Sequence, residues 1–227
     1  MAMQAWVRLP CGWVERKGLT KMIWGRDGAG SDNAAALMVL LAIAHHVDGE
    51  TGIATLTYDA LEEATGLSRS KVSNGLDILA KAEIVVRSPK GRSTYALTEY
   101  DQAPWGKLPA KRMYKGGAIA AFEDFRLRNQ VELNTLKIYF LIAARRDYET
   151  NTAHIGYDKI VEYTGVRRER IRAALSLLIA NNLIHVEHYR TNSHPSGVSI
   201  GYRLVGVDSF RHMGTSGKML DLEEGLL

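Results

Sequence analysis

An internal repeat constrains the fold of this chain more than any other feature of the sequence. When the sequence is aligned with itself at an offset of 99 residues and without a gap, residues 6–87 fall on residues 105–186, and 19 of the 82 aligned positions are identical. The identities are clustered; for example, Thr65-Gly66 recurs as Thr164-Gly165. Two copies of about 100 residues are too few and too long for a solenoid, so they predict two small domains of one fold. We expect residues 1–100 to form the first domain, 101–206 the second, and 207–227 a C-terminal tail.

Composition places the chain among ordinary globular proteins. Of its 227 residues, 46% are hydrophobic and 24% are charged, both close to the globular average. The net charge of +4 permits an anionic partner without requiring one. The single cysteine, Cys11, cannot form an internal disulfide, which suits a reducing cytoplasm; we expect it to be a buried or semi-buried small apolar residue.

No segment predicts a membrane anchor or a secretion signal. The longest uninterrupted apolar run covers only residues 34–44, whereas a spanning helix needs about 20 residues. At the N-terminus, charged residues such as Arg8 and Glu15 interrupt the apolar residues, which argues against a signal peptide. The sequence therefore predicts a soluble, cytoplasmic protein with no membrane partner.

Each half shows the same order of expected elements. In the first half, a turn-rich stretch at 25–32 with Ser31 or Asp32 as a possible cap precedes an apolar helix from about Asn33 to His46. A short strand at 53–57, a helix at 58–64, a turn at 65–67, a helix at 68–81 capped by Ser68, and strands at 84–87 and 94–97 follow. The corresponding elements of the second half are expected at 133–146, 152–156, 157–163, 164–166, 167–180, 183–189 and 201–205.

Two helices joined by a short turn containing glycine form a helix-turn-helix, and the hairpin that follows resembles the wing of the winged helix-turn-helix family. The resemblance rests on YDALEEATGLSRSKVSNGLDILAKAEIVVR and YDKIVEYTGVRRERIRAALSLLIANNLIHVE, and it covers most of both repeats. It implies an α+β, mainly α fold with two tandem winged-helix domains that bind double-stranded DNA. Two groups of such proteins fit: transcription regulators of bacterial chromosomes and mobile elements, and plasmid or phage replication initiators.

The solvent-facing side of each second helix supplies the candidate DNA-binding residues, because such a helix presents its N-terminal side chains to the bases of the major groove. In the first half we expect Arg69, Ser73 and Asn74 to contact bases, and Ser70 and Lys71 to lie closer to the phosphates. In the second half, Arg168 and Arg172 share a face and are the expected groove residues, while Arg167 and Arg170 contact the backbone.

The hairpins add basic residues that can reach a neighbouring minor groove or phosphate. These residues are Lys90 and Arg92 in the first wing, and Arg190, Asn192 and His194 in the longer second wing. The interdomain linker, about residues 98–104, spans at most about 25 Å. We therefore expect two half-sites about one helical turn apart on one face of the duplex.

Other functions find less support in the sequence. The seven histidines are not accompanied by a zinc-binding pattern such as CxxC or HExxH, and the Gly-rich stretch at 25–31 lacks the Gly-Lys-Ser/Thr ending of a phosphate-binding loop. The sequence therefore predicts no metal, no cofactor and no enzymatic activity. A tandem winged-helix scaffold for protein interactions remains an alternative, although the arginine cluster at 167–172 argues against it. A homodimer that doubles the DNA site is also possible.

Overall fold

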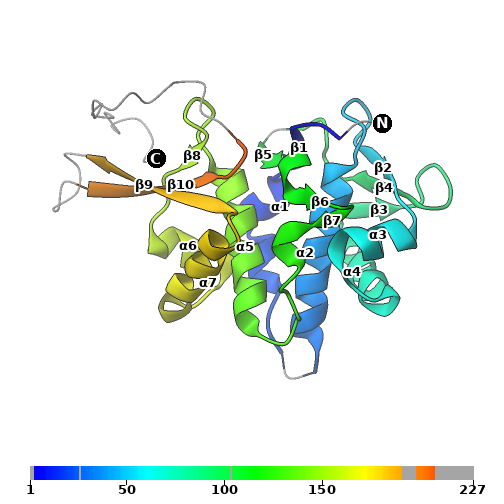
Figure 1. Cartoon of the computed structure of the whole chain (residues 1–227), viewed down its shortest axis with the longest axis horizontal. Coiled ribbons are helices and arrows are strands. Elements are labelled where there is room, and N and C mark those ends of the chain that lie inside the picture. Colours follow the sequence, from blue (N-terminus) through cyan, green and yellow to red (C-terminus); the bar gives the residue numbers. More distant parts are fainter. Residues whose placement is uncertain (1–2, 26, 103, 191–197, 208–227) are drawn as a thin grey trace.

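The structure, a computed structural model, describes residues 3–25, 27–102, 104–190 and 198–207 (Figure 1). The elements of the first half are β1 (Trp6–Pro10), α1 (Gly12–Glu15), η1 (Gly18–Lys21), α2 (Ala29–His45), β2 (Ile53–Thr55), α3 (Tyr58–Thr65), α4 (Arg69–Lys81), β3 (Val85–Arg87) and β4 (Thr94–Leu97). Those of the second half are β5 (Trp105–Pro109), η2 (Lys111–Met113), β6 (Tyr114–Lys115), β7 (Ala118–Ile119), η3 (Ala120–Phe122), α5 (Gln130–Arg145), β8 (Thr152–Ala153), α6 (Tyr157–Thr164), α7 (Arg168–Ala180), β9 (Ile184–Arg190) and β10 (Val198–Leu204). The fold is α+β, and from α2 and α5 onward the two halves have the same order of elements.

The turn between the two helices of each helix-turn-helix is built in the same way in both halves. The Thr65 hydroxyl donates to the Leu61 carbonyl at 2.5 Å and accepts from the Leu67 amide, and Gly66 ends α3 with a φ of 69°. The Thr164 hydroxyl makes the corresponding two bonds, and Gly165 has a φ of 66°. A positive φ favours glycine, so the repeated Thr-Gly pair has a direct structural cause.

Each half carries a small antiparallel sheet next to its helix-turn-helix. The strand orders are β2-β4-β3 and β8-β10-β9, and the β3–β4 and β9–β10 hairpins are the wings. The second wing is longer, since its strands pair from Ile184–Leu204 to Arg190–Val198. The expected contacts Asn192 and His194 lie outside the described residues, as does the tail from residue 208 onward.

The centre of the molecule joins the two halves. Strands β1 and β5 pair with each other in antiparallel register, with Arg8 opposite Lys107, its counterpart at the offset of 99. Trp6 stacks on Trp105, with ring centroids 6.2 Å apart. Helices α2 and α5 pack side by side beneath this pair of strands (Figure 1). The two halves thus meet around an approximate twofold axis that passes between Arg8 and Lys107.

The segments that precede the central helices cross over to the opposite half. Residues of η1 pack against α6, where Lys17 forms a 2.9 Å ion pair with Glu162. Reciprocally, β7 packs against α3, and Tyr114 of β6 forms a 3.2 Å hydrogen bond with His45 of α2. One continuous hydrophobic cluster therefore includes buried residues of both halves. Leu9 of β1 and Leu108 of β5 are buried in this cluster.

Several expected boundaries and caps differ from the structure. Helix α2 begins at Ala29, four residues earlier than expected, and its N-cap is Gly28 rather than Ser31 or Asp32. Ser68 stands at the N-cap position of α4, but its hydroxyl bonds to the Ser70 hydroxyl and caps no backbone amide. Strands β2 and β8 are shorter than expected, and β10 begins three residues earlier, at Val198.

Candidate DNA-binding surface

The N-terminal part of α4 lies against the N-terminal end of α2. The Lys71 ammonium donates to the Ser31 hydroxyl at 2.5 Å and to the Asp32 carboxylate at 2.6 Å. The Asn74 amide donates to the other oxygen of Asp32 at 3.2 Å. Lys71 is half-buried, whereas Asn74 is exposed. Asp32 therefore orients two of the predicted DNA contacts.

The corresponding contact in the second half is made by Arg170, which stands 99 residues after Lys71. Its guanidinium donates to the Gln130 side chain at the first turn of α5. Gln130 stands 99 residues after Ser31. The second helices of the two helix-turn-helix units, α4 and α7, are called the recognition helices below, and each is tied to the head of the neighbouring central helix, α2 or α5. The Asp32 carboxylate has no equivalent at the corresponding position of the second half, because the residue 99 positions after Asp32 is Val131.

Arg69 and Arg168, the first residues of α4 and α7, are held in matching arrangements. Arg69 pairs with Asp59 at 2.9 Å and lies over the Tyr58 ring, 4.9 Å from its centroid. Arg168 pairs with Asp158 and lies 5.7 Å from the Tyr157 centroid. Both arginine side chains are still more than 60% exposed. Exposed ion pairs contribute little stability, so these pairs orient the guanidinium groups without making them unavailable to a nucleic acid.

The other predicted residues of the recognition helices are accessible to different extents. Ser70, Arg167 and Arg172 are exposed, and Ser73 is half-buried. The opposite side of each helix faces the core through buried residues, which are Val72, Gly75, Leu76 and Leu79 in α4, and Ile171, Ala174, Leu175 and Leu178 in α7. The apolar spacing in the sequence thus indicated the correct outward face.

The first wing lies next to α4. Lys90 and Arg92 are exposed in the turn between β3 and β4, on either side of Gly91, whose φ is 102°. Arg87, at the end of β3, pairs with Asp77 of α4 and donates to the Tyr58 hydroxyl at 3.1 Å. Arg87 was not among the predicted residues, and its contacts fix the base of the wing against the recognition helix. Arg190 lies at the end of β9.

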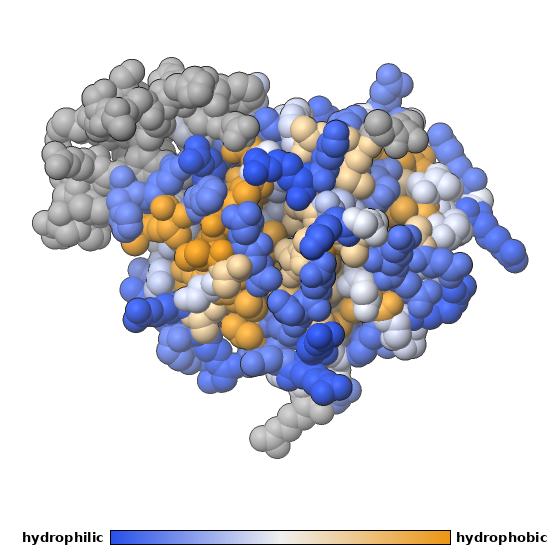
Figure 2. All heavy atoms as spheres, viewed as in Figure 1, coloured by the Kyte–Doolittle hydropathy of each residue, from blue (hydrophilic) through white to orange (hydrophobic). Residues whose placement is uncertain are grey.

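The four long helices lie in one row. In Figure 1 the order across the molecule is α7, α5, α2, α4, and packing contacts join each neighbouring pair. The N-terminal ends of α2 and α5 point to the same edge of the molecule, the lower edge in Figure 1. The amide groups and dipole at a helix N-terminus favour anions. On the face drawn in Figure 2, hydrophilic residues cover this lower edge and the surface over α3 and α4.

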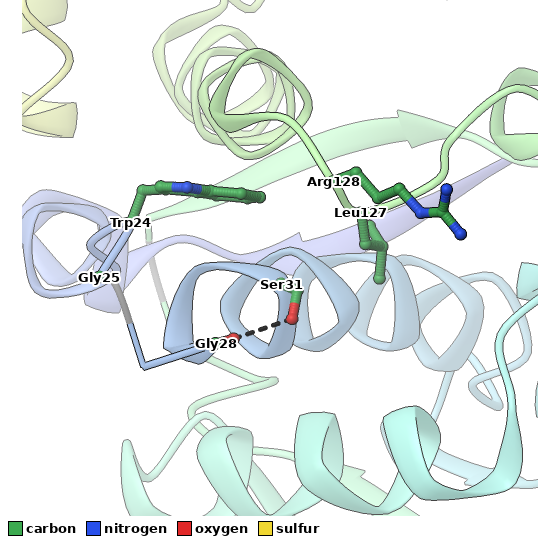
Figure 3. A pocket seen from close by; sticks show the side chains of 6 residues that line it. All are labelled: Trp24, Gly25, Gly28, Ser31, Leu127 and Arg128. Atoms are coloured by element: carbon green, nitrogen blue, oxygen red, sulfur yellow. Dashed lines mark hydrogen bonds between the residues drawn. The ribbon is translucent and has the colours of Figure 1, made fainter.

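An additional basic pair lies between the recognition helices and was not predicted. Arg126 and Arg128 are exposed in the loop before α5. Arg128 lines an open groove of about 500 Å³ together with Leu127 and with Trp24, Gly25, Gly28 and Ser31 around the head of α2 (Figure 3). The sequence offered only one signal for this pair, two arginines just before a helix, and it does not show that the loop meets the head of α2.

Two buried titratable groups, Cys11 and His45, lie away from this surface. Burial raises the pKa of the Cys11 thiol to about 12, and the residue is fully buried as predicted. Burial lowers the pKa of His45 to about 3. Within the described part of the chain, no helix combines the length and the apolar character needed to cross a bilayer.

Comparison with known families supports a helix-turn-helix in the first half. Residues 33–85, from α2 to β3, match the family model described as "Helix-turn-helix domain". The match supports a helix-turn-helix DNA-binding domain at these residues. A search of curated proteins gave no significant match to the chain.

Proposed function

We propose that the chain is a sequence-specific, double-stranded DNA-binding protein that regulates transcription through two recognition helices, α4 and α7, and their wings. The observation that carries this proposal is the row of helices: α4 and α7 stand at its two ends, with their arginine-bearing N-termini next to the heads of α2 and α5. The proposal involves no catalytic step and no cofactor.

The dimensions of the row suit one face of B-DNA. Packed helices lie about 8–10 Å apart, so three such steps place the axes of α4 and α7 about 24–30 Å apart. Successive major grooves on one face of the duplex are about 34 Å apart. Because recognition helices contact bases through side chains that extend beyond the helix axis, this separation fits half-sites about one helical turn apart, as the linker length also predicts.

The approximate twofold axis suggests how the half-sites are arranged. Helices related by such an axis meet the duplex in opposite directions, so the site is expected to be an inverted repeat. The two recognition helices differ in sequence, however, because Ser73 and Asn74 of α4 correspond to Arg172 and Ala173 of α7. Arg prefers guanine and Asn prefers adenine. We therefore expect an imperfect inverted repeat whose two half-sites have different sequences.

Selection of bound duplexes from random DNA, followed by footprinting, tests the proposal. We expect a discrete consensus with two protected segments about one helical turn apart. Asn74→Ala should relax selection in one half-site only and Arg172→Ala in the other, each costing about 1–3 kcal/mol against the cognate base. Arg112→Ala, which removes an exposed guanidinium beside Ala180 and Leu183 at the C-terminal end of α7, serves as the control. The absence of any enriched sequence would contradict the proposal and favour a protein-interaction scaffold.

A replication initiator would use the same contacts, and the DNA around the coding region separates the two functions. A series of direct repeats near the gene would favour a plasmid or phage-type initiator, whereas a lone inverted repeat at a promoter would favour a regulator. The exposed Arg168 and Arg172 count against a protein-interaction scaffold, because a scaffold would tolerate neutral or acidic residues at these positions. DNA affinity that stays unchanged when the charge of both arginines is reversed would support the scaffold. A homodimer that doubles the site stays a prediction.

A further inference from the structure

We propose that Arg126 and Arg128, in the loop before α5, enter the minor groove at the centre of the DNA site and give the protein a preference for A·T base pairs there. This inference rests on the proposed function, since it requires α4 and α7 to occupy flanking major grooves. It assigns a contact to a segment outside both helix-turn-helix units and their wings.

The loop holds the two arginines in a fixed arrangement. Leu127, between them, is 9% exposed and has a φ of 53°, an unusual conformation for a non-glycine residue. The buried Glu132 carboxylate accepts the Arg126 amide at 2.8 Å, and the Asn129 side chain accepts the Val131 amide at 3.1 Å. With its backbone tied to the first turn of α5 and its leucine anchored in the core, the loop presents Arg126 and Arg128 to solvent on either side of the anchor.

The loop lies at the middle of the proposed DNA-binding edge. Its groove is shared with Trp24, Gly28 and Ser31 at the head of α2 (Figure 3). Ser31 also bonds to Lys71 of α4, and Gln130, close behind the loop, bonds to Arg170 of α7. The loop is therefore flanked by both recognition helices. When two helices occupy successive major grooves on one face of a duplex, the groove between them is the minor groove.

The chemistry of the loop suits that groove. A·T-rich tracts have a narrow minor groove with enhanced negative potential, which attracts inserted arginines. Guanine places its N2 amino group in the minor groove, where it obstructs a guanidinium. Asp27, the acidic residue of the neighbouring loop, accepts the Ala29 amide at 3.1 Å at the start of α2. The positive end of the α2 dipole therefore offsets part of the negative charge of Asp27. The two recognition helices do not read the central base pairs, and the loop supplies that readout.

Three duplexes that differ only at the central base pairs test the inference. All three carry the two half-sites selected by the wild-type protein, and their centres consist of A·T, G·C or inosine·C pairs. Inosine lacks the N2 amino group of guanine but keeps its major-groove acceptors. We expect the A·T and inosine·C duplexes to bind about tenfold more tightly than the G·C duplex. Equal affinity for all three centres would overturn the inference.

Arginine variants assign the preference to the loop. The double substitution Arg126→Ala with Arg128→Ala should abolish the preference for the A·T and inosine·C centres. It should also reduce the salt slope, the steepness with which the logarithm of the DNA-binding constant falls with the logarithm of the salt concentration, by about 1–2. The preference for each half-site over its mutated version should remain, as should all properties of the control Arg112→Ala. If the double variant keeps the central preference, the inference is wrong while the proposed function stands. If the wild-type protein does not discriminate the half-sites at all, the proposed function itself fails.

Discussion

Asp32 is an acidic side chain at a surface that we expect to meet phosphates, and its contacts explain its presence. It accepts hydrogen bonds from Lys71 and Asn74. Asp32 therefore neutralises part of the positive charge of Lys71 and orients the side-chain amide of Asn74. The residue lies 39 positions before Lys71 in the sequence. The contact depends on how α2 docks against α4, and no local pattern in the sequence discloses it.

Substitution of Asp32 should separate these two effects. Asp32→Asn keeps an acceptor for the Asn74 amide but removes the negative charge, so Lys71 becomes available to a phosphate and the salt slope of DNA binding should rise by about 0.9. Asp32→Ala should raise the slope equally and, in addition, weaken discrimination at the base that Asn74 reads. Titrations at several salt concentrations, with cognate and mutated half-sites, measure both quantities. An unchanged slope in both variants would contradict the assigned role of Asp32.

Lys137 is a second residue whose state depends on the packing of the two halves. It is 4% exposed on α5, and its ammonium donates to the Met22 carbonyl of the first half at 2.8 Å. Burial lowers its pKa to about 8. At pH 7 the protein therefore carries a buried charge, and the corresponding position of the first half, Met38, is apolar.

This burial makes stability depend on pH in a defined direction. Between the folded pKa of about 8 and the unfolded value near 10.4, the unfolded chain binds more protons at Lys137 than the folded chain does. The contribution of Lys137 to the free energy of unfolding therefore increases as the pH rises through that range. The free energy of unfolding of Lys137→Met, relative to the wild type, should fall by about 2–3 kcal/mol between pH 7 and pH 10. Chemical denaturation at several pH values measures the difference, and a constant difference would show that Lys137 is not buried as a cation.

At the scale of elements, the close contact between α4 and α2 depends on Gly75. A Cβ atom at this position would lie 3.1 Å from the backbone of Ala36, so the two helices approach too closely for a larger side chain. Gly75→Leu should therefore displace α4 and lower the free energy of unfolding by about 1–3 kcal/mol. It should also reduce DNA binding at the half-site read by α4 more than at the other.

Thermal unfolding and half-site titration measure these two effects. Ser70→Leu, on the exposed side of the same helix, is the control for stability, because its side chain meets solvent rather than α2. If Gly75→Leu is as stable as the control, the contact between α4 and α2 is looser than the structure shows.

Elements with a clear apolar periodicity were predictable from the sequence. Elements whose conformation depends on contacts with distant parts of the chain were not. The apolar spacing at Val72, Leu76 and Leu79 placed α4 to within one residue, and the strand at Thr94–Leu97 was placed correctly. Short elements such as η1 and β6–β7 have no period of their own, since their conformation depends on contacts with the opposite half. For the same reason, the sequence identified the arginines of the recognition helices but not Arg126 and Arg128, which gain significance only from the position of their loop between α4 and α7.

At the scale of the whole molecule, the two sequence halves share one core. Sequence repetition predicts two domains, each with its own core, and the boundaries near residue 100 stay a prediction. The structure nevertheless pairs β1 with β5, packs α2 against α5, and exchanges the η1 and β6–β7 segments between halves. Helix α2 is buried over almost its whole circumference, from Ala34 to His45. Separation of the halves would expose much of this apolar surface.

The shared core should make the protein unfold as one cooperative unit. Leu178, fully buried in α7, lies in the second half, and Leu178→Ala should cost about 2–5 kcal/mol. If the halves are coupled, this loss should reduce the protection of slowly exchanging amides in α2 and α4 as much as that of amides in α5 and α7, because all of them open through the same global transition. Native-state hydrogen exchange on the wild type and Leu178→Ala measures the free energy of opening in each half. Leu79→Ala, the matched substitution in α4 at the position 99 residues earlier, should give the reciprocal result. Loss of protection confined to the substituted half would show instead that the two halves unfold independently, and that the β1–β5 pair and the α2–α5 contact contribute little to stability.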